Sequence, residues 1–351
     1  MSVSTSLPAV TVVIPAYNLR HYLRDAVQSV RCQTYGGTKQ IIILNDGSTD
    51  DTLQIAQDLA TEFDNITVHT QENQGRAKTR DRLLRLAETE FIAWLDADDI
   101  AAPSWLEDQI AYLAAHDECG AVSGQAYAMN DRCYPISPLD RHPLEHEQID
   151  QRHISGQANA FLQSCVVTRK SKLIEAGGYR PEYPAAEDFD LWLRLAEVSQ
   201  LANLDRIHLY YRVHSTAARW TINVGQREQA IQILRDARQR RGLDQPVAPS
   251  EPIPPAKKDD WNSRVYWIIA ALRSGNPKSA IGLIGTACKR HPGSLLIWIL
   301  LVVAACDCVL FLGNRNDRFA IGKEAVLRGL PTWSIYRLGR FLNRKRRQLF
   351  A

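Results

Sequence analysis

The first half of the chain alternates short apolar runs with longer segments of helical periodicity. The apolar runs at 10–14, 41–44, 66–70 and 91–95 predict strands, and the segments 20–32, 52–63, 77–87 and 103–116 predict helices. Because these strands are continuously apolar rather than alternating, we expect a mostly parallel sheet that helices cover on both faces. The pattern therefore predicts an α/β fold whose ligands bind beyond the carboxyl ends of the strands.

The pattern changes after residue 225. Residues 226–241 predict a charged helix that ends at Gly242, and residues 245–255 hold five prolines, which is typical of a semi-rigid linker. Residues 261–292 predict two helices joined by a Gly-Asn-Pro turn. We expect one domain over 1–225, a helix and Pro-rich linker over 226–260, and a helical accessory region over 261–351.

Residues 295–312 form a long apolar run, LLIWILLVVAACDCVLFL, that contains Asp307. A helix of this length reaches only about 27 Å, and a charge inside a membrane span costs about 3 kcal/mol on insertion scales. A single span would also export the basic residues that follow, against the positive-inside tendency. We therefore favour a helix that lies in the membrane interface or packs in the accessory region, with a true span as the alternative.

Positive charge is concentrated at the end of the chain. Residues 313–351 hold ten Lys or Arg against two acids, whereas the whole chain has a formal charge of +3. The segment 337–350 interleaves these cations with Leu and Phe, which suits an anionic membrane surface; a solvated basic end is the alternative. No basic face accompanies a recognisable nucleic-acid-binding fold, so no nucleic-acid partner is expected.

The spacing of the cysteines and the N-terminal sequence both indicate in which cellular compartment the protein works. The seven cysteines form no CxxC pair and no metal-ligand spacing, which is typical of a reducing compartment. The opening MSVSTSLPAV has no basic segment followed by an apolar core, so it predicts no secretory signal. We expect a cytoplasmic protein, peripheral at the inner face of the cell membrane.

Polar loops follow the four predicted strands. They read PAYN at 15–18, NDGSTDD at 45–51, ENQGRAKTR at 72–80 and DADD at 96–99. Asp96, Asp98 and Asp99 would repel one another, so a divalent cation beside them would explain the cluster. A solvated Asp-rich turn that caps the next helix is the alternative.

Two further features of these loops suit a nucleotide. Asp46 provides a carboxylate that can accept hydrogen bonds from a base, although a turn residue is the alternative. Arg76, Lys78 and Arg80 begin a predicted helix, where a nearby anionic ligand would explain them and a solvated basic face explains them equally well. No GxGxxG follows the first strand and no GxxxxGK[ST] occurs in the chain, which disfavours ordinary dinucleotide and P-loop sites.

Six motifs in this order resemble the family 2 glycosyltransferases, which have the GT-A fold. They are VVIPAYN, LNDGSTDDT, ENQGRAKTR, WLDADD, GGYRPEYPAAEDFDLWLRL and YRVH, and they span about residues 8–220. The resemblance implies inverting transfer of a sugar from a nucleoside-diphosphate sugar, with a UDP-sugar favoured and Mg²⁺ or Mn²⁺ as cofactor. Together with the C-terminal features, it indicates a cell-envelope glycan or lipid-linked acceptor.

The resemblance also implies how the donor is bound. Asp98 of the DxD motif would bind the metal, and Asp96 would contact the ribose or the metal. His214 would reach the metal or the donor phosphates. The remaining donor contacts would come from the nucleoside pocket, with Asp46 on the base, Arg76 at the edge, and Pro15, Ala16 and Tyr17 as lining.

The resemblance implies a general base in the segment EDFDLWLRLAE. Asp188 would remove the proton of the acceptor hydroxyl, with Glu187 as its support; an amphipathic helix with an acidic first turn is the alternative. Asn45 stands where the family commonly has Asp, which leaves the base and sugar of the donor open. Asp81 also departs from the family pattern, and this departure is expected to be harmless. A nucleotidyltransferase and a non-catalytic donor-binding or scaffold protein are the alternative functions.

Overall fold

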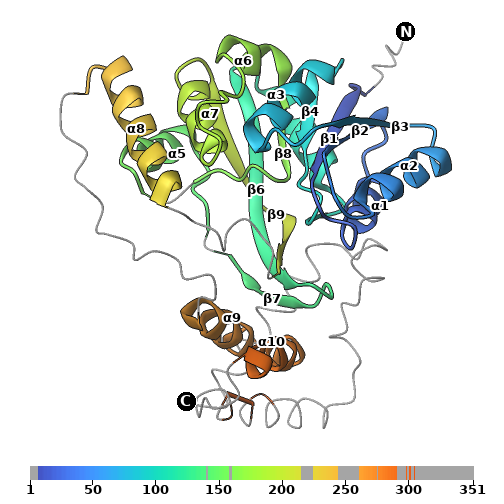
Figure 1. The fold of residues 1–351 in the computed structure, drawn as a ribbon. Coiled ribbons are helices and arrows are strands. Elements are labelled where there is room, and N and C mark those ends of the chain that lie inside the picture. The colour runs from blue at the N-terminus through green and yellow to red at the C-terminus, as the bar shows by residue number, and fades with distance from the viewer. Residues whose placement is uncertain are drawn as a thin grey trace. The chain divides into compact units, whose positions relative to one another are not determined.

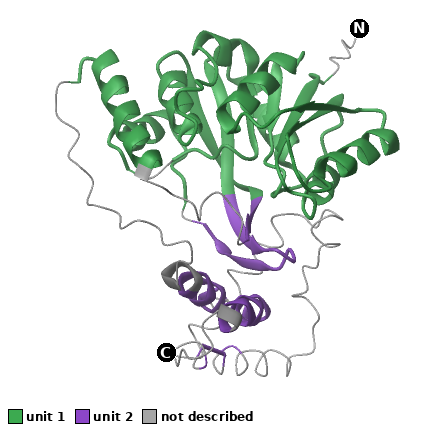
Figure 2. Ribbon diagram, in the orientation of Figure 1, with its two compact units in different colours: residues 1–125, 141–209, 222–255 green, residues 126–140, 210–221, 256–351 purple. Residues whose placement is uncertain are grey.

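The computed structural model describes residues 7–139, 141–157, 160–214, 224–243, 261–274 and 276–290, and four positions between 298 and 304. The chain forms two compact units (Figure 2). The first unit comprises Met1–Gln125, Arg141–Leu209 and Ile222–Pro255, and the second comprises Ala126–Asp140, Tyr210–Thr221 and Ala256–Ala351. Strands β6 (Cys119–Asn130) and β9 (Gln200–Val213) each contain a boundary between the two units.

The sheet of the first unit starts with the predicted parallel strands (Figure 1). They are β1 (Val10–Ala16), β2 (Lys39–Asp46), β3 (Ile66–Gln71) and β4 (Phe91–Trp94), in the order β3-β2-β1-β4. The accompanying helices are α1 (Leu23–Arg31), α2 (Thr52–Glu62), α3 (Arg76–Leu86) and α4 (Trp105–Ala115). The predictions of these strands and helices, and of an α/β fold, are confirmed.

Beyond β4 the sheet becomes mixed. The full order is β3-β2-β1-β4-β8-β6-β9-β5, and β8 runs antiparallel to both β4 and β6. The remaining elements that lie wholly within the first unit are β5 (Ile100–Ala101), β8 (Val166–Arg169), α5 (His146–Ile154), α6 (Lys170–Glu175), α7 (Glu187–Leu195) and α8 (Val224–Arg240). The parallel half therefore carries the loops identified from the sequence, and the antiparallel half extends the sheet.

A buried cluster joins the sheet to α3 and α7. It includes Val13 of β1, Leu44 of β2 and Trp94 of β4, together with Leu83 of α3 and Trp192 of α7. Burying apolar surface contributes about 25 cal/mol per Å², so these large side chains are a main source of stability for the unit. The helices that carry polar residues are thus held on the sheet by their apolar faces.

The described part of the second unit packs two helices on strand residues. Helices α9 (Trp261–Arg273) and α10 (Pro277–Arg290) bury Ile268 and Ile284 against Ile136 of strand β7 (Pro135–Pro138). Asn276 Nδ2, in the turn between the helices, donates to the Ile136 carbonyl at 2.8 Å. The predicted pair of helices is confirmed, and Gly275 of the predicted turn lies outside the described residues.

The predicted membrane-interface helix at 295–312 falls almost wholly outside the described residues, and the basic segment 313–351 falls outside them entirely. Among the residues that the structure describes, no helix is both long enough and apolar enough to cross a membrane.

Candidate active site

The carboxyl ends of β1 and β2 bring two of the predicted loops together. Ala16 of β1 pairs with Asn45 of β2 in the parallel register. Asn18 Oδ1 accepts a hydrogen bond from the Thr49 backbone N–H at 2.8 Å, which ties the first loop to the second. Ala16 is buried, Pro15 is half-buried and Tyr17 is exposed, so Tyr17 presents its ring at this edge of the sheet.

Asp46 lies at the end of β2 and holds the loop that precedes α3. Its Oδ1 accepts hydrogen bonds from Gln74 N at 2.9 Å and Gln71 Nε2 at 2.7 Å, and its Oδ2 accepts one from Gly75 N at 3.0 Å. Gly47 turns the chain here with a φ of 70°, and a Cβ at this position would lie 2.6 Å from the Asn73 nitrogen. Asp46 therefore shapes the loop around the predicted base contact, and that contact stays a prediction.

The structure distinguishes the three aspartates that follow β4. Asp99 is only 2% exposed and donates its backbone N–H to the Asp96 carbonyl at 3.1 Å. Asp96 and Asp98 are partly exposed at the edge of the sheet, and the Asp96 carboxylate is 34% exposed. Two partly exposed carboxylates separated by one buried residue, Ala97, supply hard oxygen ligands of the kind that Mg²⁺ and Mn²⁺ prefer. This donor set fits the implied cofactor.

Arg80 links the DxD motif to the ED motif. This side chain of α3 is 4% exposed, and its Nη2 lies 2.8 Å from Asp96 Oδ1 while its Nη1 lies 2.5 Å from Glu187 Oε1. Burial alone would lower the pKa of Arg80, but the charges of Asp96 and Glu187 outweigh it and raise the pKa. The interpretation of Arg80 as part of a solvated basic face is therefore wrong, because carboxylates of the protein surround it. An anionic ligand near this helix start stays a prediction.

Glu187 and Asp188 begin α7 with different environments. Glu187 is 1% exposed, and burial raises its pKa although Arg80 opposes the shift. Asp188 is only half-buried, and its Oδ1 accepts a hydrogen bond from the Phe189 N–H at 2.8 Å. Arg76 of α3 lies near the same helix start, with its Nε 3.6 Å from Glu187 Oε1. Of the two carboxylates, that of Asp188 is the one with solvent access.

His214 belongs to the second unit, where it is buried. Within the described ranges, no group of three or more His, Cys, Asp and Glu side chains is arranged to hold a metal ion. The role implied for His214 thus stays a prediction, and Asp96 and Asp98 are the carboxylates available at the sheet edge.

Comparison with known sequences points to one family. The family model described as glycosyl transferase family 2 matches residues 11–177. The amylovoran biosynthesis glycosyltransferase AmsE of Erwinia amylovora is 31% identical over 209 residues, which is 58% of this chain and 76% of AmsE. An uncharacterized glycosyltransferase of Haemophilus influenzae is 29% identical over 248 residues, which is 65% of this chain and 73% of that protein.

Two solved structures share the fold. Residues 1–349 of S. aureus TarS in complex with UDP-GlcNAc give a TM-score of 0.54 at 18% identity, over 89% of this chain and 94% of that one. The mannosyltransferase PcManGT of Pyrobaculum calidifontis, in complex with GDP-Man and Mn²⁺, gives 0.52 at 19% identity, over 93% and 86%. The chain spans about half, 53%, of the longer TarS structure. At these identities the likeness shows the fold.

Proposed function

This chain belongs to glycosyl transferase family 2 and is a glycosyltransferase, and we propose that it transfers a sugar with inversion from a nucleoside-diphosphate sugar, with a UDP-sugar favoured. The single observation that carries the proposal is the Arg80 bridge, in which one buried cation pairs with Asp96 of the DxD motif and with Glu187, the neighbour of Asp188. TarS and PcManGT, which share the fold, are described in complexes with UDP-GlcNAc and GDP-Man. AmsE is named for amylovoran biosynthesis, which supports a cell-envelope glycan or lipid-linked acceptor.

Asp98, with Asp96, would hold Mg²⁺ or Mn²⁺ in the proposed reaction. A bound divalent ion supplies Lewis-acid stabilisation of the charge on the leaving diphosphate. Asp96 is oriented by Arg80 and by its own backbone N–H, which donates to Ser164 Oγ at 3.2 Å. Asp46, Arg76, Pro15, Ala16 and Tyr17 form the proposed nucleoside pocket, and His214 is proposed to reach the metal or the phosphates.

Asp188 is the proposed general base. Its carboxylate would take the proton from the acceptor hydroxyl, a step typically worth about 10²–10⁴ in rate. Glu187 is buried against Arg80. We propose a supporting role for Glu187, because a general base must lie within hydrogen-bond distance of the acceptor hydroxyl and Glu187 is paired with Arg80 instead.

The proposed catalytic domain covers 1–225, followed by the helix and linker over 226–260 and the accessory region over 261–351. The basic residues of 313–351 support a place at the inner face of the cell membrane.

The test is isothermal titration of the full chain with UDP-, GDP-, dTDP- and CMP-sugars, with and without Mn²⁺, for wild type, Asp98→Asn and Asp188→Asn. We expect Mn²⁺-dependent binding of a UDP-sugar that Asp98→Asn loses and Asp188→Asn keeps. Asp64→Asn, at an exposed position before β3, is the matched control. Absence of donor binding by a folded wild-type protein would contradict the donor assignment. Donor binding with full sugar transfer by Asp188→Asn would contradict its role as base.

The alternatives are separated by assays of the same proteins for turnover, with nucleoside triphosphates offered alongside the sugar nucleotides. A nucleotidyltransferase would release pyrophosphate from a nucleoside triphosphate. A non-catalytic donor-binding protein would bind the sugar nucleotide equally well in wild type and Asp188→Asn, with no turnover in either.

A further inference from the structure

Helix α8 lies beyond the region that the family motifs cover, yet it belongs to the first compact unit. There it packs beside α5 and α7, and α7 begins with Glu187 and Asp188 (Figure 1). We infer that α8 positions the catalytic helix α7 by holding it at both ends, so that residues of α8 act on the reaction without contacting the substrate. The inference rests on the proposed function of Asp188.

An apolar contact fixes the faces of the two helices. Ile233, Leu234 and Ala237 of α8 are buried in one cluster with Ala186 and Leu193, which stand just before α7 and near its end. This contact sets the distance between the two helices. Apolar packing is not directional, so by itself it only weakly opposes sliding of one helix along the other. The axial position therefore depends on polar contacts.

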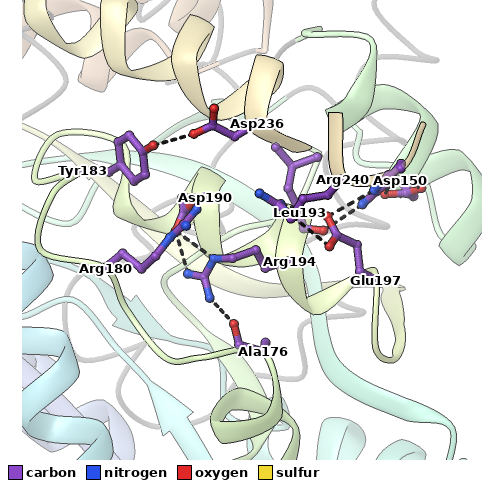
Figure 3. A network of polar contacts seen from close by, with 11 residues as sticks. Asp150, Ala176, Arg180, Tyr183, Asp190, Leu193, Arg194, Glu197, Asp236 and Arg240 are labelled. Carbon is purple, nitrogen blue, oxygen red and sulfur yellow. Dashed lines mark hydrogen bonds and ion pairs between the residues drawn. The ribbon is translucent and has the colours of Figure 1, made fainter. Parts of the chain in front are cut away.

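The start of α7 is held through the loop before it. Gln229 Oε1 of α8 accepts a hydrogen bond from the Ala185 backbone N–H at 3.0 Å. The Tyr183 hydroxyl donates to Asp236 Oδ2 of α8 at 2.7 Å, and Figure 3 shows the Tyr183 ring pointing at that carboxylate. Both anchored residues lie within five positions of Asp188. The backbone that leads into the catalytic residue is thus tied to α8.

The end of α7 is held by arginines at the end of α8. Arg241 Nη2 donates to the Leu193 carbonyl at 2.7 Å, and its Nη1 forms a bidentate ion pair with Asp150 of α5 at 2.7 and 2.8 Å. Arg240 Nη2 lies 2.8 Å from Glu197 Oε1, just beyond α7 (Figure 3). The last carbonyls of a helix have no partner within the helix, so arginine donors at this place are favourable.

A separate network keeps α7 folded if these contacts are weakened. Asp190, which is buried in α7, pairs with Arg180 and with Arg194 (Figure 3). Arg194 Nη2 also donates to the Gly178 carbonyl at 2.7 Å. Loss of a single contact from α8 is therefore expected to shift α7 rather than unfold it. A shift of about 1 Å in a catalytic group can cost about 10²-fold in rate.

The test compares wild type with Gln229→Ala, Gln229→Glu and the control Glu228→Gln, an adjacent and exposed position on the same helix. Gln229→Glu keeps an acceptor for the Ala185 N–H. The first readout is hydrogen exchange of the peptide over 183–190 in the full chain, which needs no donor. We expect faster exchange in Gln229→Ala and wild-type exchange in the other two. Unchanged exchange in Gln229→Ala would overturn the inference.

The second readout is nucleoside-diphosphate release from UDP-GlcNAc and GDP-mannose with water as acceptor. For the donor that turns over, we expect Gln229→Ala to lower kcat about tenfold or more with KM within about twofold, and Gln229→Glu to restore kcat. Wild-type kcat in Gln229→Ala, alongside lost turnover in Asp188→Asn, would overturn the inference and leave the proposed base in place. Wild-type turnover in Asp188→Asn would instead remove the proposed base.

Discussion

Arg80 is the cation on which the arrangement of acidic side chains depends. It is buried between the Asp96 and Glu187 carboxylates, so Arg80→Met would leave the buried Glu187 charge with only the more distant, half-exposed Arg76 as a partner. Removing one partner of a buried ion pair typically costs about 3–5 kcal/mol, and we expect a loss of this size in the free energy of unfolding. Arg80→Lys is expected to lose less, although a single ammonium cannot reproduce the fork that spans both carboxylates. Urea unfolding of both variants measures the two losses.

Lys78→Met is the control for the Arg80 prediction, because Lys78 is exposed on the same helix. Its free energy of unfolding is expected to stay within about 0.5 kcal/mol of wild type. A loss in Arg80→Met no larger than that of Lys78→Met would show that the bridge is not energetically important.

The contrast between Lys78 and Arg80 shows which property of single residues the sequence did not predict, namely which of two similar cations is buried. The resemblance to the family motifs implied roles for Asp96, Asp98 and Asp188, and the structure leaves all three partly exposed. Lys78 and Arg80 look alike in the sequence, but two residues rotate a helix by about 200°, so one faces solvent and the other faces the sheet. Which of them is buried depends on the direction of α3 over the sheet, and this only the three-dimensional arrangement supplies.

At the scale of elements, Asp108 ties α4 to β9. Its Oδ1 lies 2.7 Å from Arg206 Nη1, and its Oδ2 lies 3.1 Å from Nε2 of the buried His208. Burial alone would raise the pKa of Asp108, but hydrogen bonds from His208, Ser104 and Arg206 outweigh it and lower the pKa to about 2. Burial also lowers the pKa of His208, so this imidazole is held neutral more strongly than in the unfolded chain.

The sign of the resulting pH dependence follows from these two shifts. The depressed pKa of Asp108 stabilises the folded state above about pH 4, and this stabilisation is lost as the pH falls through 2. Its full size is about 2 kcal/mol. The lowered pKa of His208 acts in the same direction, because the unfolded chain takes up that proton first as the pH falls below about 6.5.

We expect Asp108→Asn to be about 2 kcal/mol less stable than wild type at pH 7, with about half of the difference gone by pH 3. Urea unfolding at pH 7, 5 and 3 measures it. Asp117→Asn serves as the control, because Asp117 is 98% exposed. A gap between wild type and Asp108→Asn that stays constant from pH 7 to pH 3 would contradict the assignment.

The same scale shows why some strands escaped prediction. Strands β1 to β4 are runs of β-branched and large apolar residues, which the pattern identifies directly. Strand β6 reads CGAVSGQAYAMN, with small and polar residues throughout. Its Gly124 is required by a close approach, since a Cβ there would lie 2.4 Å from His208 Nδ1 of β9. Small residues selected for contact across the sheet lack the propensity signal of a strand.

At the scale of the whole chain, charge is the property that differs most between the ends. The first 312 residues carry a formal charge of −5 and the rest +8, which sums to the +3 of the protein. Each Lys or Arg near an anionic membrane contributes about 1 kcal/mol of attraction. We therefore predict that replacing Arg344, Lys345, Arg346 and Arg347 with Gln weakens binding to vesicles rich in phosphatidylserine by about 10³-fold. Co-sedimentation over a range of lipid concentrations measures it.

A control with the same net charge separates a local effect from a global one. Replacing Arg24, Arg31, Lys78 and Arg85 with Gln removes four exposed cations from the first unit. If the C-terminal cluster binds the membrane, this control keeps nearly wild-type affinity, and raising the salt weakens wild type far more than the tail variant. Equal losses in the two variants would assign the attraction to overall charge. Full binding by the tail variant would show that these four basic residues do not anchor the protein to the membrane. The apolar run at 295–312 would then be the favoured anchor.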